Sequence, residues 1–212
     1  MQSPLSFLAF GDSLTAGYAS YGLVHHPYSI NLKNLFSSSN IPVIIEQRGI
    51  SGERVVPSMV RRLEELLKQN TYDWVIILGG TNDLGYGKPA DQIFNDGLKL
   101  MYDMVLQHTN SKTKLVAMTV IENGIYSPDN IRDKSRQTLN NMILNYVENY
   151  PDQTRICLVD LDKLIPFHSI KDIAQRDSIW DDTIHLTPAG YDQMGYFIFQ
   201  EIYKKMQTEN KQ

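Results

Sequence analysis

The sequence is poor in cysteine. Cys157 is the only cysteine among 212 residues, so the chain cannot form an internal disulfide. It lies in the apolar run RICLVD, where we expect a small buried side chain rather than a nucleophile.

Long apolar runs are missing as well. None approaches the roughly 20 residues that a membrane-spanning helix needs, so we expect no integral membrane association. The N-terminus has neither the basic start nor the long apolar stretch of a signal peptide. We therefore expect a cytoplasmic protein; a trimmed form of a secreted protein would have the same sequence.

Positive charge is not concentrated anywhere in the chain. The formal net charge is −4, and lysine and arginine are scattered, which argues against a nucleic-acid partner. Repeats, low-complexity tracts and Pro/Gly-rich linkers are also absent from the sequence. We expect one domain over residues 1–206, followed by a polar tail over 207–212. Nothing in the sequence indicates an oligomeric state.

What the chain does contain is an alternation of short apolar runs with longer segments of helical period. The runs are nearly continuously hydrophobic, which is typical of parallel strands covered on both faces. They predict five strands: Ser6–Phe10, Pro42–Gln47, Asp73–Leu78, Lys114–Val120 and Arg155–Asp160.

Apolar residues recur at helical spacing between Val56 and Leu67 and between Leu139 and Val147. A last helix should begin at Thr187-Pro188 and run to about Met206, burying Met194, Ile198 and Ile202. The predicted fold class is therefore α/β, a three-layer α/β/α sandwich around a five-stranded parallel sheet.

In such sheets the working site lies beyond the carboxyl ends of the strands. Ser13 follows the first strand, in the stretch FLAFGDSLTAGY. A serine hydroxyl needs an adjacent base to act as a nucleophile. Of the five histidines, His185 in WDDTIHLTPAG has Asp182 three residues before it, and Asp181, four residues before it, is the second candidate partner.

Acyl transfer also needs hydrogen-bond donors for a developing oxyanion. Gly52, in RGISGER after the second strand, could present a bare backbone N–H, and Asn82, in GGTNDLG after the third, could present its side-chain amide. Either loop could instead be an ordinary turn with a left-handed glycine. We expect Asp83, beside Asn82, to hold its own turn by local hydrogen bonds.

Together these four blocks, in this order, resemble the SGNH/GDSL hydrolase superfamily. The resemblance implies the flavodoxin-like SGNH hydrolase fold and serine ester hydrolysis without metal or cofactor. It implies that Ser13 is the nucleophile, His185 the base and Asp182 its orienting acid. It also implies an oxyanion hole built from the backbone N–H groups of Ser13 and Gly52 and the amide of Asn82.

One residue departs from the family pattern. Gln47 stands where many members have an asparagine that opens the second block, which puts the anchoring of that loop in question. The nucleophile elbow Gly-x-Ser-x-Gly of α/β-hydrolases occurs nowhere in the chain, so that assignment is the poorer one.

Further residues are candidates for the substrate pocket. We expect Tyr18, His26 and Trp180 to line it, with ordinary packing as the alternative for the aromatic residues. The pair His25-His26 has no carboxylate or cysteine close in sequence, so we predict no metal site there.

The predicted function is hydrolysis of small carboxylic esters through an acyl-enzyme, with a small-molecule ester as the partner. The substrate could also be an O-acetylated carbohydrate, a lysophospholipid or an acyl thioester, because specificity lies in loops. A non-catalytic domain that binds a carbohydrate or another partner is the alternative from a different class.

Overall fold

Five parallel strands form the centre of the fold in the computed structural model, which describes residues 3–107 and 112–209. They pair in the order β4-β1-β5-β6-β7. Each predicted strand is confirmed to within two residues at either end. Their bounds are Leu5–Gly11 (β1), Val43–Gly49 (β4), Trp74–Leu78 (β5), Lys114–Met118 (β6) and Ile156–Val159 (β7).

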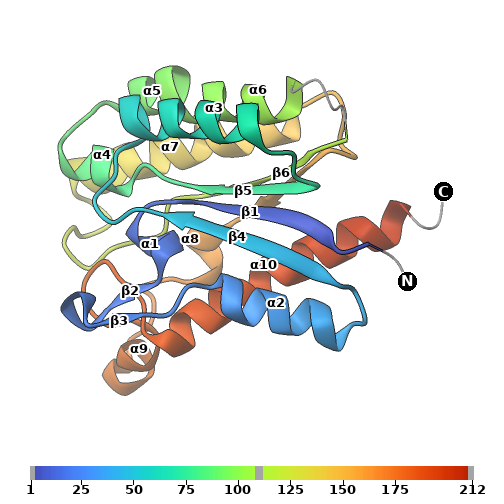
Figure 1. Cartoon of the computed structure of the whole chain (residues 1–212). Coiled ribbons are helices and arrows are strands. Elements are labelled where there is room, and N and C mark those ends of the chain that lie inside the picture. Colours follow the sequence, from blue (N-terminus) through green and yellow to red (C-terminus); the bar gives the residue numbers. More distant parts are fainter. Residues whose placement is uncertain (1–2, 108–111, 210–212) are drawn as a thin grey trace.

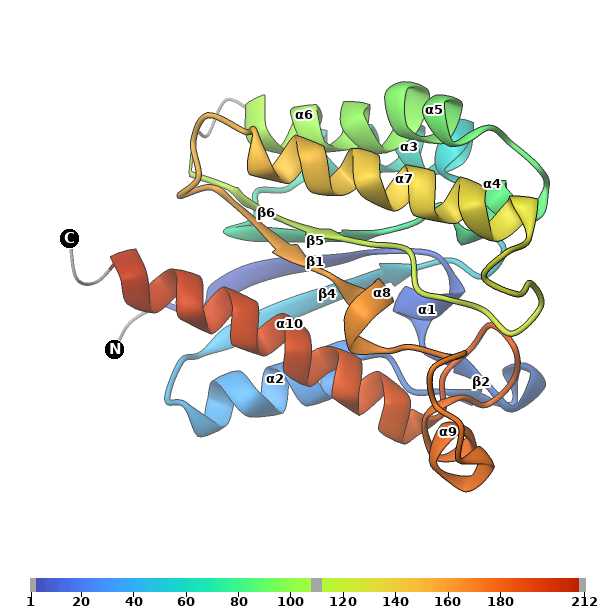
Figure 2. The ribbon, with the colours of Figure 1, turned by 180° about the vertical axis from the view of Figure 1, so that it is seen from behind.

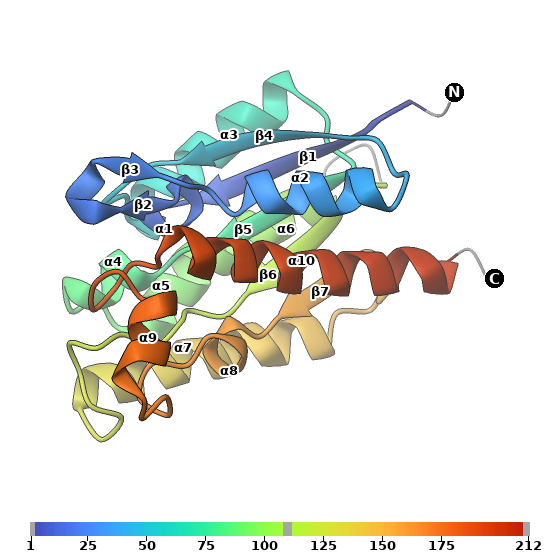
Figure 3. The same cartoon turned by 90° about the horizontal axis from the view of Figure 1, so that it is seen from below.

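Helices cover both faces of the sheet, which confirms the three-layer fold (Figure 1). One face carries α3 (Val60–Gln69), α5 (Ala90–Ile93), α6 (Lys99–Gln107) and α7 (Ile131–Glu148), as Figure 2 shows from behind. The other face carries α2 (Ser29–Ser38) and α10 (Pro188–Glu209), which lie side by side in Figure 3. Among the described residues, no helix is long and apolar enough to cross a membrane.

Short elements connect these layers. They are α1 (Ser13–Ala16), the two-stranded hairpin of β2 (Tyr18–Ala19) and β3 (Val24–His25) around the 3-10 turn η1 (Ser20–Gly22), α4 (Thr81–Gly85), α8 (Leu161–Leu164), α9 (Ile173–Ile179), and two π turns, η2 (Val55–Met59) and η3 (Phe94–Leu98).

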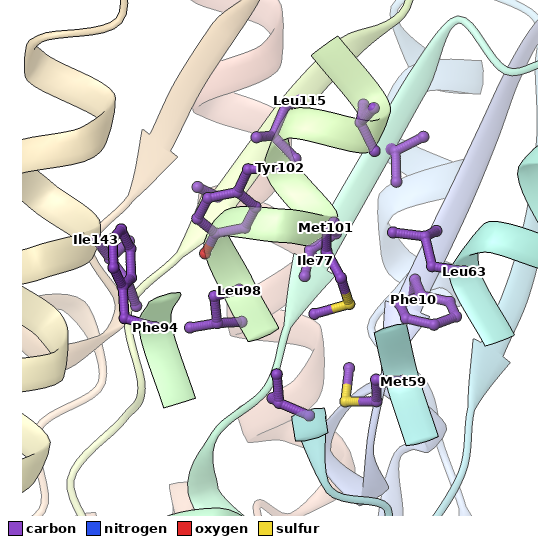
Figure 4. Close-up of a cluster of buried hydrophobic side chains, with 14 of the residues drawn as sticks. Phe10, Met59, Leu63, Ile77, Phe94, Leu98, Met101, Tyr102, Leu115 and Ile143 are labelled. Carbon is purple, nitrogen blue, oxygen red and sulfur yellow. The ribbon is translucent and has the colours of Figure 1, made fainter. Parts of the chain in front are cut away.

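The core is divided by the sheet into two clusters, because successive strand residues point to opposite faces. Phe10 and Ile77 belong to the cluster under α3 and α6, where they lie near Met59, Leu63 and Met101 (Figure 4). The alternate strand residues face α2 and α10. The strands are therefore buried on both faces, which explains why they read as continuous apolar runs.

The last helix follows the prediction at its start. Thr187 Oγ1 accepts a hydrogen bond from the Gly190 N–H at 3.1 Å, and the three predicted core residues Met194, Ile198 and Ile202 are fully buried. The helix continues to Glu209, so the first three residues of the predicted tail are helical. Residues 210–212 of that tail lie outside the described residues.

The stripe that begins at Val56 is helical only from Val60 onward. Val56 itself is extended, with φ −109° and ψ 121°, because the ring of Pro57 disfavours the helical conformation in the residue before it. The apolar side chains of this turn still pack into the core, since Val55 and Met59 are fully buried. The spacing therefore indicates which side chains are buried, and it does not locate the start of the α-helix.

Strand order locates the functional edge. The chain leaves β1 through α2 on one face to reach β4, and then crosses by α3 on the other face to reach β5. The direction of winding therefore reverses next to β1. Ligands of doubly wound sheets bind at the carboxyl ends of the strands beside such a reversal. In register, Gly11 lies opposite Gly49 of β4 and Leu78 of β5, so three strand exits meet there.

Candidate active site

Ser13 lies directly beyond β1, as the first residue of α1. Asp12 caps this short helix, its Oδ1 accepting the Leu14 N–H at 3.0 Å. Gly11 is required by close approach, because a Cβ there would lie 2.2 Å from Thr15 Oγ1. The Ser13 side chain is thereby held in a narrow turn, and its residue is only 7% exposed.

A chain of hydrogen bonds joins Ser13 to His185 and Asp182. Ser13 Oγ lies 3.0 Å from His185 Nε2, and His185 Nδ1 lies 2.9 Å from Asp182 Oδ2. A carboxylate accepts hydrogen bonds only, so Nδ1 donates to it and Nε2 is left to accept from the serine hydroxyl.

Asp182 is fixed by its own backbone. Its Oδ1 accepts the N–H groups of Ile184 and His185, both at 2.6 Å. Burial raises the pKa of this carboxyl, but the hydrogen bonds from the His185 ring and from the two backbone N–H groups outweigh burial and hold it below its usual value. Asp182 is therefore an ionised partner for the imidazole.

Asp181 has a different role from its neighbour. Its Oδ2 accepts the Ser20 N–H at 2.7 Å, and its own N–H donates to the His185 carbonyl. The carboxylate thus anchors the hairpin of β2 and β3 and does not contact the imidazole ring.

Asn82 and Gly52 lie at the exits of β5 and β4. Asn82 Nδ2 donates to the Glu53 carbonyl at 2.9 Å and lies 3.4 Å from Asp12 Oδ2. Gly52 has a φ of 78°, and its N–H has no acceptor among the described residues. Gly52 can therefore present an N–H donor at this edge of the sheet, whereas the Asn82 amide is directed at the Glu53 carbonyl and at Asp12.

The loop after β4 is anchored from two sides. Asp83 is fully buried, and its hydrogen bonds reach beyond its own turn: its carboxylate accepts the N–H groups of Val55 at 2.7 Å and of Val56 at 3.4 Å, 28 and 27 residues earlier in the chain. On the other side, Arg62 binds the Glu53 carboxylate and donates to the Gly11 carbonyl at 3.1 Å.

Gln47 supplies a further anchor. Its Nε2 donates to the Thr15 carbonyl at 3.1 Å, which ties β4 to the turn that carries Ser13. The residue that departs from the family pattern thus connects β4 to α1, and the loop after it is held by Asp83 and Arg62.

The three predicted pocket residues make contacts of different kinds. The Tyr18 ring packs against the His185 ring, with centroids 4.5 Å apart. His26 Nε2 contacts Asp192 Oδ1 of α10 at 2.8 Å, and Trp180 is 3% exposed with its Nε1 donating to the Pro166 carbonyl. His26 and Trp180 therefore hold loops in place.

Metal-ligating side chains do not gather anywhere in the described part of the chain. No three His, Cys, Asp or Glu residues within it form a group that could hold a metal ion.

A cavity of about 60 Å³ opens beside the site. Its walls are mostly apolar, and they come from α4, from the segment after β6, from α7 and from the loop that carries His185. They include Thr81, Leu84, Val120, Ile125, Tyr126, Arg132 and Ile184. The sequence reasoning missed these residues, although the strand-exit rule applied to β6 would have pointed to Val120–Tyr126.

Comparison with known proteins yields one family and several similar structures. The profile of the GDSL-like Lipase/Acylhydrolase family matches residues 9–193. No curated protein matches the chain.

Similar solved structures include an acetylxylan esterase from Geobacillus stearothermophilus, with 18% identity, a TM-score of 0.70 and 94% of both chains covered. A family 3 carbohydrate esterase from Clostridium thermocellum has 17% identity, a TM-score of 0.71 and coverage of 97% of this chain and 98% of that chain. A psychrotrophic esterase from Pseudoalteromonas sp. has 17% identity, a TM-score of 0.69 and coverage of 95% and 98%. At these identities the likeness concerns the fold.

Asp12 generates a prediction about stability. Burial, together with the charges of Asp83 and Glu53, outweighs the Leu14 hydrogen bond and raises the pKa of its carboxyl from 3.8 to about 7. Between pH 3.8 and about pH 7 the unfolded chain releases the Asp12 proton and the folded chain keeps it. The free energy of unfolding therefore falls as pH rises, by roughly 4 kcal/mol in all.

Asp12→Asn stays neutral at every pH and can still accept the Leu14 N–H. We expect the melting temperature of this variant, relative to wild type, to increase from pH 4 to pH 8 in thermal scans. Asp182→Asn is the matched control, because the lowered pKa of Asp182 contributes stability that is lost only as pH falls below 3.8, so its difference from wild type should stay nearly constant from pH 4 to pH 8. A difference in melting temperature between Asp12→Asn and wild type that stays constant with pH would contradict this account.

Proposed function

The chain belongs to the GDSL-like lipase/acylhydrolase family and is a carboxylic ester hydrolase, and we propose that it is a serine esterase for esters with a short acyl group. The observation that carries the proposal is the continuous hydrogen-bond chain from Ser13 through His185 to Asp182, with distances of 3.0 and 2.9 Å. This is the arrangement that activates a serine hydroxyl.

In the acylation step, Ser13 Oγ attacks the ester carbonyl carbon while His185 Nε2 takes the hydroxyl proton. Asp182 stabilises the imidazolium that forms. The carbonyl oxygen becomes negative and accepts hydrogen bonds from the N–H groups of Ser13 and Gly52 and from the Asn82 amide. When the tetrahedral intermediate collapses, the ester C–O bond breaks, the alcohol takes the proton from His185, and Ser13 carries the acyl group.

Deacylation repeats these roles with water. His185 Nε2 takes a proton from a water molecule that attacks the acyl carbon, and the same donors bind the second oxyanion. Collapse releases the carboxylic acid and returns the proton to Ser13 Oγ. The proton transfers in both steps are supported by the hydrogen bonds that join Ser13, His185 and Asp182.

Two observations support a short acyl group. The cavity beside the site has a volume of about 60 Å³, which suits an acetyl-sized group better than a long chain. Two of the similar structures are named as an acetylxylan esterase and a carbohydrate esterase. We therefore propose small O-acyl esters, such as acetylated carbohydrates, ahead of lysophospholipids.

The proposal is tested with p-nitrophenyl acetate and p-nitrophenyl octanoate. We expect turnover of both esters to depend on Ser13, with the acetate preferred, and an organophosphonate to inactivate the enzyme by labelling Ser13 alone. Mass spectrometry locates the adduct, and Ser13→Ala is the control. No turnover by folded wild type, or an adduct on another residue, would count against an esterase that uses Ser13.

The two neighbouring aspartates should differ sharply in kinetics. Asp182→Asn should lower kcat by orders of magnitude, about 10⁴-fold for the analogous change in a serine protease, because an amide can stabilise the wrong imidazole tautomer. Asp181→Asn should have little effect, since its amide oxygen can still accept the Ser20 N–H. Steady-state kinetics on both variants decides between them, and the reverse ranking would assign the partner of His185 to Asp181.

Asn82→Ala separates a catalytic donor from a structural anchor. Loss of an oxyanion donor should lower kcat by about 10²–10³-fold with little change in KM, because the amide acts chiefly when negative charge develops. The lost bond to the Glu53 carbonyl should lower the melting temperature only modestly, since Asp83 and Arg62 still hold that loop. A large loss of stability with kcat retained would remove Asn82 from the oxyanion hole.

A further inference from the structure

Arg132 is a cation held in place at the wall of the cavity. Its Nη1 donates to the Gly85 carbonyl at 2.8 Å and to the Leu84 carbonyl at 3.3 Å, at the end of α4. Its guanidinium carbon lies 5.6 Å from the centre of the Tyr126 ring, within cation–π range. These contacts come from two separate elements, so the guanidinium is positioned before any ligand arrives.

The charge of Arg132 is not neutralised by a neighbouring side chain. No carboxylate of the described residues lies within ion-pair distance of it. By contrast, Arg136 on the next turn of α7 pairs with Asp133 and Asp162, and Arg62 pairs with Glu53. Nε and Nη2 of Arg132 also have no hydrogen-bond partner in the part of the chain that the structure describes.

A second polar group without a partner lies on the same wall. Thr81 lines the cavity, and its buried Oγ1 has no hydrogen-bond partner among the described residues. A buried hydroxyl without a partner is costly, so a ligand that supplies one is bound selectively. Thr81 directly precedes Asn82, and Ile184, another lining residue, directly precedes His185. The cavity therefore adjoins the segments that carry Asn82 and His185.

We infer that this site prefers esters that carry an anionic group a few bonds from the reacting carbonyl, with the Arg132 guanidinium and the Thr81 hydroxyl binding that group. The inference rests on the proposed function and narrows its substrate class. Apart from Asn123 and the paired Arg136, the remaining walls are mostly apolar, so they suit the short carbon chain that joins the ester to the anion. Charge-assisted hydrogen bonds of this kind are the strong ones.

The anion can stand on the acyl or on the alcohol side of the ester, and four substrates distinguish the two. Monomethyl succinate carries a carboxylate on the acyl side, and methyl 4-methylpentanoate is its uncharged counterpart of similar shape. Acetoxyacetate carries a carboxylate on the alcohol side, and isobutyl acetate is its uncharged counterpart. Acid release at constant pH measures kcat/KM for all four.

We expect one charged ester to exceed its uncharged counterpart about tenfold in kcat/KM, with the preference reduced at high salt because the Arg132 side chain is exposed. Arg132→Gln should abolish the preference, and Thr81→Val, which keeps the shape but loses the hydroxyl, should reduce it. Arg54→Gln is the matched control: Arg54 is also exposed and lies over a tyrosine ring, that of Tyr86, but it does not line the cavity.

Each outcome decides the inference. A preference that Arg132→Gln removes and Arg54→Gln keeps supports it. Equal rates for charged and uncharged esters, or a preference that survives in Arg132→Gln, overturns it while turnover of p-nitrophenyl acetate leaves the esterase proposal intact. Lack of turnover with every ester, p-nitrophenyl acetate included, contradicts both proposals. Melting temperatures establish that each variant is folded.

Discussion

The parallel pairing of β1 with both β4 and β5 is the constraint on which the site depends. It places Gly11 level with Gly49 on one side and with Leu78 on the other. Ser13, the loop that contains Gly52, and α4 with Asn82 therefore leave the sheet at the same edge. A slip of one residue in either pairing would exchange the buried faces of a strand, so two core clusters hold this register.

This edge concentrates buried acidic groups behind the serine. Asp12 and Asp83 are fully buried, and burial raises the pKa of both carboxyls. Their hydrogen bonds nevertheless hold the turn of Ser13 and the loop after β4, which are the segments that carry the proposed oxyanion donors. Burial of these two carboxyls costs folding stability, but their hydrogen bonds fix the N–H groups of the site. This is common where a site must be positioned before the substrate binds.

The histidine side of the site is built differently. Asp182, Ile184 and His185 form a turn whose hydrogen bonds span two or three residues, so the carboxylate and the imidazole are oriented by local geometry. Only the last bond, from His185 to Ser13, joins segments 172 residues apart. Packing of α10 on the sheet brings Asp182 and His185 to the serine as an oriented pair. The Tyr18 ring packs against the imidazole ring.

The sequence by itself determined the features that depend on neighbours along the chain. Continuous apolar runs marked the strands, Thr187 and Pro188 marked the start of α10, and a three-residue spacing selected Asp182 for His185. Only the tertiary structure decided the rest, including the partners of Asp83 and the unneutralised charge of Arg132 at the cavity. The physical reason is that periodicity reports the burial of one segment, whereas a hydrogen bond or ion pair between distant segments depends on how the layers pack.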